Sequence, residues 1–430
     1  MWMTSRPEPP AARRSTVGMA LYGDVTYDSR VRKEARSLSQ AGYNVSIVCL
    51  AGEATASDLP ENVRVLVRDP GRGAVIPGAT NAFFGPASMG RRGGRVSTAL
   101  RRAGWLLGYA RSLRGWGRLA VAAAGPIDAW HAHDLTGLAA IAPNVPKGIP
   151  IVYDSHELFL EAATASRLPG PLRQFLRRYE RHLVARTSAV ITVNEEIADV
   201  LHRRYRPRRI EVVHNCPDRW IAPTHRATLL REAARIPAGA PIILYHGALT
   251  AQRGIEQLID ALLEPGLEEA HLVLMGFGDR RDEYVEMTRS DRLRGHAHVL
   301  DAVSPDELLA WVASADVGAM PIPGKTMNDY LSAPNKLFEC LAAGVPVVAS
   351  DIPAMRRIVM GDPNRPLGAL CDPSRVDAIA DALNSILGLS QPAGDALRAR
   401  CAAAAAQWWN WQVESVILTQ LYADILAAPA

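Results

Sequence analysis

The sequence predicts an α/β protein with two doubly wound, Rossmann-like domains whose parallel sheets face a central cleft. The chain has 430 residues, more than one hydrophobic core usually supports, so two domains are expected. Short apolar stretches alternate with amphipathic helical stretches in both halves, which is typical of parallel sheets covered by helices. Polar residues follow several of these apolar stretches directly, and ligands of such folds bind at the carboxyl ends of the strands.

The composition is that of a folded globular protein. Apolar residues make up 48% of the chain and charged residues 21%, which excludes a chain that is disordered throughout. The net charge of +4 is small but unevenly distributed, because the segment 71–120 contains many arginines and no acidic residue. The basic bias stops at this segment, so no nucleic-acid partner is expected.

Neither the cysteines nor the apolar runs indicate an extracellular or membrane-spanning protein. The five cysteines are scattered, without the spacing of a zinc site or a disulfide framework. No apolar run reaches the roughly 18 residues that span a bilayer. Residues 1–15 are rich in Pro and Arg without an apolar core, so we expect a disordered leader there. The expected location is cytoplasmic, with at most peripheral contact to the inner face of the membrane.

The first domain is expected over residues 16–216. Its first unit is a strand, a helix and a second strand, at 17–22, 29–41 and 44–50. The loop before this helix carries Gly23, Asp28 and Arg30 but lacks the GxGxxG pattern of nicotinamide-binding domains. Further strands are predicted at 129–131, 151–153, 189–193 and 210–213. Four polar clusters follow these strands directly and are expected to share one crevice; they are HAHD, DSHE, NEE and HNCP.

A basic insert at 71–120 interrupts this alternation. It begins as a loop rich in Gly and Pro and ends, from about Arg95, in a helical pattern that contains Trp105 and Trp116. Such a helix at 95–120 suits contact with anionic lipid, contact with a long acceptor, or packing as a solvated insertion on its own domain. The sequence leaves these three interpretations open.

The second domain is expected over residues 217–407, after a proline-bearing connector. A strand at 242–246 leads into a loop with Gly247, Arg253 and Gly254, and a helix follows. Further strands are predicted at 271–275, 317–320, 347–350 and 368–370, and Gly276, Phe277 and Gly278 close the first of these. Residues 408–430 form an amphipathic segment that is expected to cross back towards the first domain.

The stretch 332–351 carries the clearest site chemistry, and it predicts a loop, a helix and a buried strand. Pro334 suits the first helical position, where the exposed amide hydrogens of a helix start can bind an anion. Lys336 adds a cation, and Glu339, one turn later, can accept hydrogen bonds from sugar hydroxyls. Gly344 ends the helix. Taken alone, the stretch fits an ordinary helix–turn–strand with a solvated Lys and Glu equally well.

In these motifs the chain resembles the family-4 glycosyltransferases of the GT-B fold, over nearly its whole length after about Val17. No single landmark is decisive, but together and in this order they are specific to the family. The landmarks are RVRKEARSL at 30–38, YDSHEL at 153–158, the loop from YHG at 245–247 to Arg253 and Gly254, MGFG at 275–278, and the stretch 332–351.

The resemblance implies a retaining, hexosyl-type glycosyltransferase that acts in cell-surface glycan or glycoconjugate biosynthesis. The second domain would hold a nucleoside-diphosphate sugar and the first domain an acceptor. The implied catalytic residues are His156, Arg253 and Lys336, with Glu339 as the acid that binds the ribose. The implied donor-binding residues are Gly23, Gly247, Arg253, Gly276, Phe277, Gly278, Pro334, Asn335, Lys336, Leu337 and Glu339. The acceptor-side candidates are Asp28, Arg30, Asp134 and Glu157, each of which also suits a helix cap or a structural ion pair.

The partners implied are a nucleotide-sugar donor and an acceptor that is a glycan, a lipid-linked molecule or a small molecule. Cations and helix-start amides can stabilise the departing diphosphate, so neither a cofactor nor a metal ion is expected. Two positions depart from the family's pattern. Leu331 stands eight residues before Glu339, where the family commonly has a second Glu, and Ala248 follows Gly247, where it often has Arg. The identity of the transferred sugar is therefore not predicted.

Three other functions remain open on the residues alone. One is a nucleotide-sugar epimerase or hydrolase on the same scaffold, which would use a carboxylate pair and no acceptor. Another is a non-catalytic module that binds sugar nucleotides. The third is a metal-dependent hydrolase, although its extended HxHxDH spacing is absent and His131 is expected to end its strand and point into the sheet. The hydrolase would use His131, His133, Asp134, Asp154 and His156.

Overall fold

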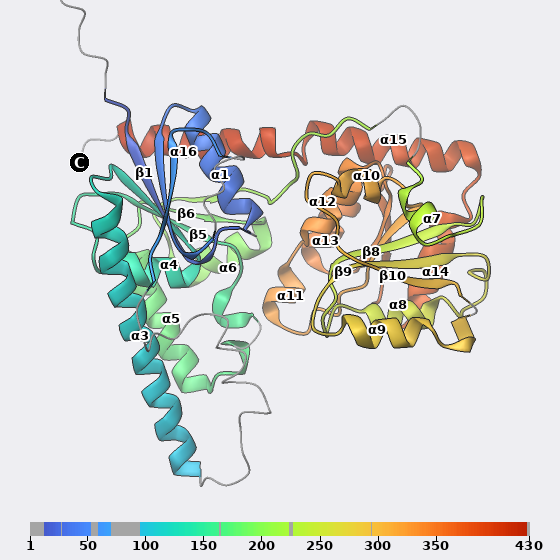
Figure 1. The fold of residues 1–430 in the computed structure, drawn as a ribbon, viewed down its shortest axis with the longest axis horizontal. Coiled ribbons are helices and arrows are strands. Elements are labelled where there is room, and N and C mark those ends of the chain that lie inside the picture. The colour runs from blue at the N-terminus through green and yellow to red at the C-terminus, as the bar shows by residue number, and fades with distance from the viewer. Residues whose placement is uncertain are drawn as a thin grey trace, which may run out of the picture.

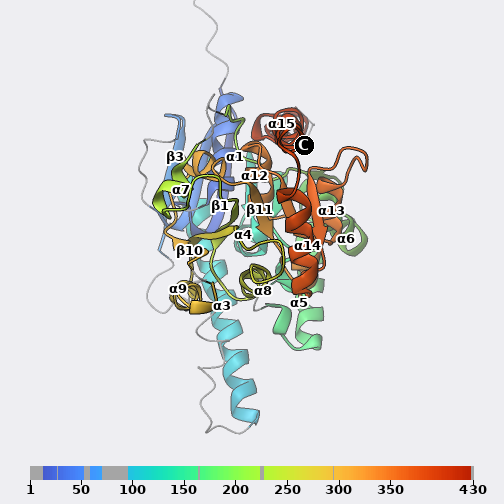
Figure 2. The same ribbon diagram turned by 90° about the vertical axis from the view of Figure 1, so that its right-hand side faces the viewer.

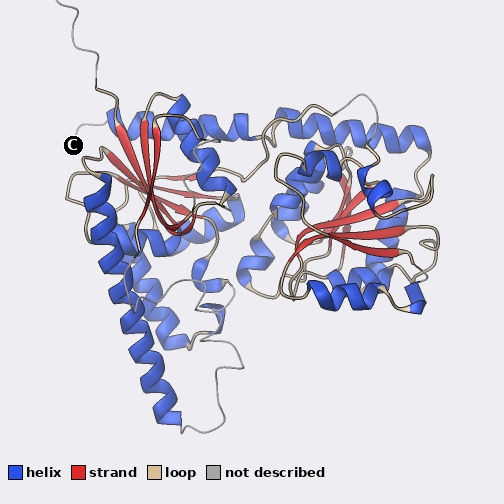
Figure 3. Ribbon diagram, in the orientation of Figure 1, coloured by secondary structure: helices blue, strands red, loops and turns tan. Residues whose placement is uncertain are grey.

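The computed structural model describes residues 13–26, 28–52, 59–69, 95–162, 165–222, 227–293 and 295–427, with side chains from residue 108 onward in the helix that starts at Arg95. Two α/β domains lie side by side, each built on one parallel sheet with helices on both faces (Figures 1 and 3). The predicted fold class, two Rossmann-like domains, is confirmed.

The first sheet has seven parallel strands in the order β3-β2-β1-β4-β5-β6-β7. In β1, Val17 and Met19 pack on one face, whereas Ala20 and Tyr22 pack on the other. Burial on both faces explains why this strand is a nearly continuous apolar run. The strands are β1 (Thr16–Asp24), β2 (Asn44–Ala51), β3 (Val63–Val67), β4 (Ala129–His133), β5 (Ile151–Ser155), β6 (Ala189–Thr192) and β7 (Ile210–Val212).

Helices cover both faces of this sheet. The helix α1 (Ser29–Gln40) lies on one face and begins where the Asp28 carboxylate accepts a hydrogen bond from the Val31 amide at 3.1 Å. The other face carries α3 (Arg95–Ala124), α4 (Asp134–Ile141), α5 (Gly170–Val184) and α6 (Glu195–Tyr205). Two short 3-10 turns, η3 (Phe159–Glu161) and η4 (Ala165–Arg167), precede α5.

The basic insert ends in α3, which packs against α4 and extends well past the sheet (Figures 1 and 2). Trp116 is fully buried, and its indole nitrogen donates to the Arg68 carbonyl at 3.0 Å. Trp116 therefore belongs to the core and is not available to a lipid surface, while Arg111, Arg114 and Arg118 are exposed. The rest of the insert, 71–94, and the Trp105 side chain lie outside the described residues.

The second sheet has six parallel strands in the order β10-β9-β8-β11-β12-β13. Its strands are β8 (Ile242–Ala248), β9 (His271–Phe277), β10 (Ala297–Leu300), β11 (Val317–Met320), β12 (Val347–Ser350) and β13 (Gly368–Cys371). Its helices are α7 (Leu229–Ala233), α8 (Ile255–Ala261), α9 (Arg281–Thr288), α10 (Leu308–Val312), α11 (Met327–Leu331), α12 (Asn335–Ala342), α13 (Pro353–Val359), α14 (Val376–Leu387) and α15 (Gln391–Gln407), with a 3-10 turn, η5 (Asp291–Leu293). The edge strands β3 and β10 were not predicted.

The last helix, α16 (Trp411–Ala427), returns to the first domain (Figure 1). It packs beside α1, and its side chains Leu418, Leu421 and Tyr422 are fully buried in the same core cluster as Met19. The Trp411 indole nitrogen also donates to the Ser37 hydroxyl at 2.9 Å. The first domain is therefore completed by a segment that follows the second domain in the chain.

Within the described residues, no helix combines the length and the apolar character that crossing a bilayer requires.

We expect Leu418→Ala to lower the free energy of unfolding by about 2–5 kcal/mol, because Leu418 is fully buried and its truncation leaves a cavity. Urea denaturation measures this loss. The matched control on the same helix is Val416→Ala, since Val416 is 63% exposed and should change stability by no more than about 0.5 kcal/mol. Equal effects of the two substitutions would contradict the packing of α16 on the first domain.

Candidate functional site

A cavity of about 1140 Å³ lies between the two domains. Its lining includes residues that follow β1, β5, β6 and β7 of the first sheet, and residues at the ends of β8 and β9 of the second. The carboxyl ends of both parallel sheets therefore open into one cavity. This is the place where doubly wound folds bind their ligands.

The start of α12 forms one wall of this cavity. Pro334 is the N-cap residue of this helix, with φ −74° and ψ 147°. The first helical residue is therefore Asn335, whereas the sequence analysis placed Pro334 there. Lys336 and Glu339 line the cavity, whereas Leu337 is fully buried in the core of the second domain. Residues three apart share one face of a helix and an intervening residue does not. The Leu337 side chain therefore does not reach the cavity, and its assignment to the donor site remains a prediction for the backbone amide alone.

Two cations, Lys336 and Arg253, lie at this wall without a carboxylate partner among the described residues. The Lys336 ammonium nitrogen lies 3.5 Å from the centroid of the Tyr245 ring. Burial and the neighbouring charge of Arg253 lower the pKa of Lys336 to about 7. Because the amide hydrogens of a helix start also favour negative charge, this wall is suited to bind an anion such as a diphosphate.

Glu339 faces the same cavity from one turn further along α12. The His246 Nε2 atom, at the end of β8, lies 2.8 Å from Glu339 Oε2. Burial alone would raise the pKa of Glu339, but the hydrogen bond and charge of His246 and the charge of Lys336 lower it below its ordinary value. The carboxylate is therefore held ionised, as an acceptor for ligand hydroxyls. His246 was not among the predicted site residues.

Glycines bring β8 and β9 close together beside this wall. Gly247 lines the cavity at a φ of +104°, a conformation that favours glycine. A Cβ on Gly276 would lie only 1.9 Å from the Gly247 carbonyl oxygen. The glycine at 276 is thus required by the contact between the strands. Phe277 lines the cavity with 69% of its surface exposed, whereas Gly278 is not part of the lining.

His156 forms part of the opposite wall, in the first domain. Its Nε2 atom lies 2.9 Å from Asp154 Oδ2, and its Nδ1 atom lies 3.5 Å from Asp134 Oδ2. Burial would lower the pKa of His156, but these two carboxylates raise it to about 10. His156 is therefore an imidazolium at neutral pH, and a sugar hydroxyl would have to compete with Asp134 for its Nδ1 proton.

The acceptor-side candidates divide into two groups. Asp28 and Glu157 line the cavity, and burial together with the charge of Asp134 raises the pKa of Glu157 to about 7. Arg30 also borders the cavity, but it is 2% exposed and both its Nε and Nη2 atoms donate to Asp154 at 2.8 Å. Asp134 is not part of the lining. Its carboxylate lies beside His156, and its backbone has a positive φ of 56°. Arg30 is thus first of all a structural ion-pair partner.

Gly23 was expected to approach the donor from the first domain, but it is not part of the cavity lining. Its neighbour Asp24 lines the cavity instead. The metal-dependent hydrolase also loses its support. Because β4 runs to His133, His131 lies in the middle of the strand, and both histidines are fully buried away from the cavity.

The loop before α11 and α11 itself contribute lining residues that the sequence analysis missed. Lys325, Asn328 and Asp329 line the cavity. Asn328 also joins the domains, because its Oδ1 atom accepts a hydrogen bond from the Leu158 amide at 2.9 Å. A signal was present in the sequence: Thr326 and Asp329 have capping-box spacing, and the Asp329 amide donates to the Thr326 hydroxyl at 3.0 Å.

Leu331, which stands where a second Glu was expected, also serves the contact between domains. Its side chain packs against the core of the first domain, and its carbonyl accepts a hydrogen bond from Asn194 at 2.9 Å.

The two domains and the cavity between them indicate the fold class of the protein. Two Rossmann-like domains whose parallel sheets open into one shared cavity are characteristic of the GT-B fold. Solved structures agree with this class. Sucrose-phosphate synthase from Thermosynechococcus elongatus superposes with a TM-score of 0.74 at 18% identity, covering 97% of this chain and 100% of that chain. HepE from Anabaena in complex with UDP-glucose superposes with a TM-score of 0.65 at 17% identity, covering 96% of this chain and 100% of that chain.

Sequence comparison gives the family. The chain matches the family described as "Glycosyltransferase Family 4" over residues 29–219 and the one described as "Glycosyl transferases group 1" over residues 240–388. It is 28% identical over 294 residues to D-inositol 3-phosphate glycosyltransferase of Xylanimonas cellulosilytica, a match that covers 64% of this chain and 66% of that relative. The chain belongs to the family-4 glycosyltransferases of the GT-B fold, as the sequence motifs predicted.

Proposed function

We propose that the protein is a retaining glycosyltransferase that moves a hexosyl group from a nucleoside-diphosphate sugar to a hydroxyl of an acceptor. One observation carries the proposal. Lys336, Arg253 and the start of α12 form an anion site on the wall that also presents the ionised Glu339. In a nucleoside diphosphate, the diphosphate is bonded to the ribose. This wall offers cations and helix-start amides to the diphosphate and a carboxylate to the ribose hydroxyls. The HepE complex with UDP-glucose supports a donor of this kind.

The two walls would divide the work. On the donor wall, Lys336, Arg253 and the helix-start amides would stabilise the charge that develops on the departing diphosphate. On the opposite wall, Asp28 and Glu157, which line the cavity, would bind acceptor hydroxyls. The cavity of about 1140 Å³ slightly exceeds the usual range of about 300–1,000 Å³ for ligand sites. That size is suited to a donor and an acceptor together.

The proposed stereochemical course is retention. The acceptor hydroxyl would attack the anomeric carbon on the face from which the diphosphate departs, forming the new C–O bond as the old one breaks. Its proton would pass to the departing phosphate oxygen. The charge state of His156 supports this course, because an imidazolium cannot take that proton.

The acceptor is proposed only by class. The relative named for D-inositol 3-phosphate supports a polyol or a glycoconjugate precursor, as used in the synthesis of cell-surface glycans. The exposed arginines of α3 suit contact with an anionic surface or with an acidic acceptor. Action in the cytoplasm, with peripheral membrane contact through α3, is part of the same proposal.

We expect a nucleoside diphosphate to raise the melting temperature of the protein, because it binds only the folded state. A concentration about 100 times the Kd should stabilise the fold by about 2.7 kcal/mol. Arg253→Ala and Glu339→Ala should each abolish this thermal shift, since they remove a phosphate contact and a ribose contact. Screening UDP, GDP and ADP by thermal shift would also identify the base.

Two exposed residues of the same domain provide matched controls. Arg289 and Glu286 pair with each other on the surface of the second domain, so Arg289→Ala and Glu286→Ala should leave the thermal shift unchanged. Nucleotide binding that survives in both Arg253→Ala and Glu339→Ala would refute the assignment of the donor site.

Nucleotide affinity should fall as the pH rises above 7. The pKa of Lys336 is about 7 in the free protein, and a bound diphosphate raises it, so binding takes up a proton between these two values. The Kd should therefore rise by up to about tenfold per pH unit between pH 7 and 9. Isothermal titration calorimetry measures this slope. Lys336→Arg should flatten it, because arginine stays charged; an equal slope in that variant would contradict the role of Lys336.

The product should have the same anomeric configuration as the donor sugar. NMR of the product, read from the one-bond carbon–proton coupling constant at the anomeric centre, gives the configuration for any hexose. A product of inverted configuration would exclude the proposed retention but would still agree with a glycosyltransferase. Consumption of the donor at full rate without any acceptor would instead identify an epimerase or hydrolase.

A further inference from the structure

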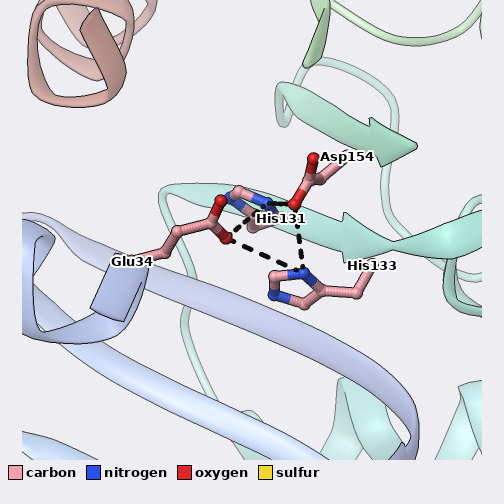
Figure 4. Close-up of side chains that lie close together, drawn as sticks. All are labelled: Glu34, His131, His133 and Asp154. Carbon is pink, nitrogen blue, oxygen red and sulfur yellow. Dashed lines mark ion pairs between the residues drawn. The ribbon is translucent and has the colours of Figure 1, made fainter. Parts of the chain in front are cut away.

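A second group of chemically active side chains lies inside the first domain, outside the lining of the cavity described above. It consists of Glu34 from α1, His131 and His133 from β4, and Asp154 from β5, and all four are fully buried. His131 and His133 are two residues apart in a strand and so point to the same face, which α1 covers. Figure 4 shows the four side chains directed toward one another.

The distances within this cluster suit a shared ion better than hydrogen bonds. His131 Nε2 lies 3.4 Å from Glu34 Oε2 and 3.6 Å from Asp154 Oδ2. His133 Nδ1 lies 3.8 Å and 3.5 Å from the same two oxygens. Direct hydrogen bonds would bring such atoms to about 2.7–3.2 Å. In a tetrahedral zinc site with bonds of about 2.0–2.2 Å, neighbouring ligand atoms lie roughly 3.3–3.6 Å apart.

Several polar atoms of the cluster are buried without a hydrogen-bond partner. Among the residues that the structure describes, Glu34 Oε2 and the Nε2 atoms of His131 and His133 make no hydrogen bond, and Glu34 Oε1 has only the ion pair with Arg30 Nε at 3.2 Å. Polar groups in a protein interior are nearly always paired, because an unpaired buried group forfeits its interaction with water. Glu34 and His131 Nε2 both face the common centre, where an ion would satisfy them.

The surrounding residues complete what a metal site needs. The His131 Nδ1 atom lies 2.9 Å from the Tyr422 hydroxyl, the type of contact that orients a ligating imidazole. Arg30 donates to both oxygens of Asp154, and the Nε2 atom of the His156 imidazolium lies 2.9 Å from Asp154 Oδ2 while its Nδ1 atom faces Asp134. The three carboxylates Glu34, Asp134 and Asp154 thus face two cations, which leaves one negative charge to neutralise. An oxygen of Asp154 that accepts hydrogen bonds can still bind an ion, because ligating carboxylates are commonly hydrogen-bonded.

We propose that Glu34, His131, His133 and Asp154 bind one divalent transition-metal ion of the zinc class. Imidazole and carboxylate ligands are typical of such ions. The four ligands are fully buried and outside the cavity lining, so the ion has a structural role: it fastens α1 to the central strands β4 and β5. It takes no part in the proposed transfer reaction, which the anion site of the second domain supports.

The test is the metal content of the full-length protein, purified without chelators and dialysed against metal-free buffer. Plasma mass spectrometry should find roughly one equivalent of zinc or a related ion. Glu34→Gln should lose it, because the substitution keeps the shape but removes a charged ligand. The matched control is Glu180→Gln. Glu180 is also a buried carboxylate of the first domain, but it accepts from Tyr205 at 2.6 Å outside the cluster, so this variant should keep the metal.

A second histidine group needs its own control. His271, His296 and His298 lie together in the second domain, and metal that is lost from His298→Gln but kept by Glu34→Gln would overturn the proposal. So would wild-type protein that holds no metal and whose melting temperature does not rise with added zinc or cobalt chloride. If Glu34→Gln does not fold, X-ray absorption of the wild-type metal decides: two imidazole nitrogens with carboxylate oxygens support the site, and a shell of three imidazoles refutes it.

Discussion

The buried guanidinium of Arg30 is the contact on which the geometry of the first domain depends. It binds both oxygens of Asp154, approaches Glu34 to 3.2 Å and donates to the Val213 carbonyl at 2.7 Å. One side chain thereby links α1, β5 and the chain segment that leads to the second domain. Breaking a buried pair of this kind typically costs about 3–5 kcal/mol, because the remaining charge is left uncompensated. Asp154 in turn orients the ring of His156, so the position of His156 in the cavity wall depends on the contact between Arg30 and Asp154.

Burial lowers the pKa of a cationic group on both walls, but the outcome differs between them. On the donor wall it lowers the pKa of Lys336 to about 7, which leaves the ammonium ready to regain full charge when an anion arrives. On the other wall, Asp134 and Asp154 outweigh burial and raise the pKa of His156 to about 10. The same physical effect, desolvation, is thus outweighed by two carboxylates at His156, whereas at Lys336 the charge of Glu339 opposes it only in part. The cavity is adapted to receive negative charge on one side only.

The sequence predicted most of the fold because both sheets are buried on two faces, and buried parallel strands read as apolar runs. It missed β3 and β10, two edge strands that are only partly buried, although it found the other two edge strands, β7 and β13. Lys336 and Glu339 could be assigned because their spacing is local. The burial of the Leu337 side chain could not be seen from the family motif, because the direction of each side chain depends on its position around the helix. Three members of the cluster, His131, His133 and Asp154, were grouped in the hypothesis of a metal-dependent hydrolase, but Glu34 was not, since about a hundred residues separate it from them and no local spacing connects it to them.

The return of α16 to the first domain has a consequence for how the protein is made. A ribosome releases the first sheet long before it releases Leu418 and Tyr422, so the nascent first domain must wait with one apolar face uncovered. The second domain can finish folding in that interval. The first domain therefore begins to fold before the second domain but is completed after it, when the last helix, α16, has been synthesised. A fragment cut between the domains would lack that helix and would expose a surface prone to aggregation.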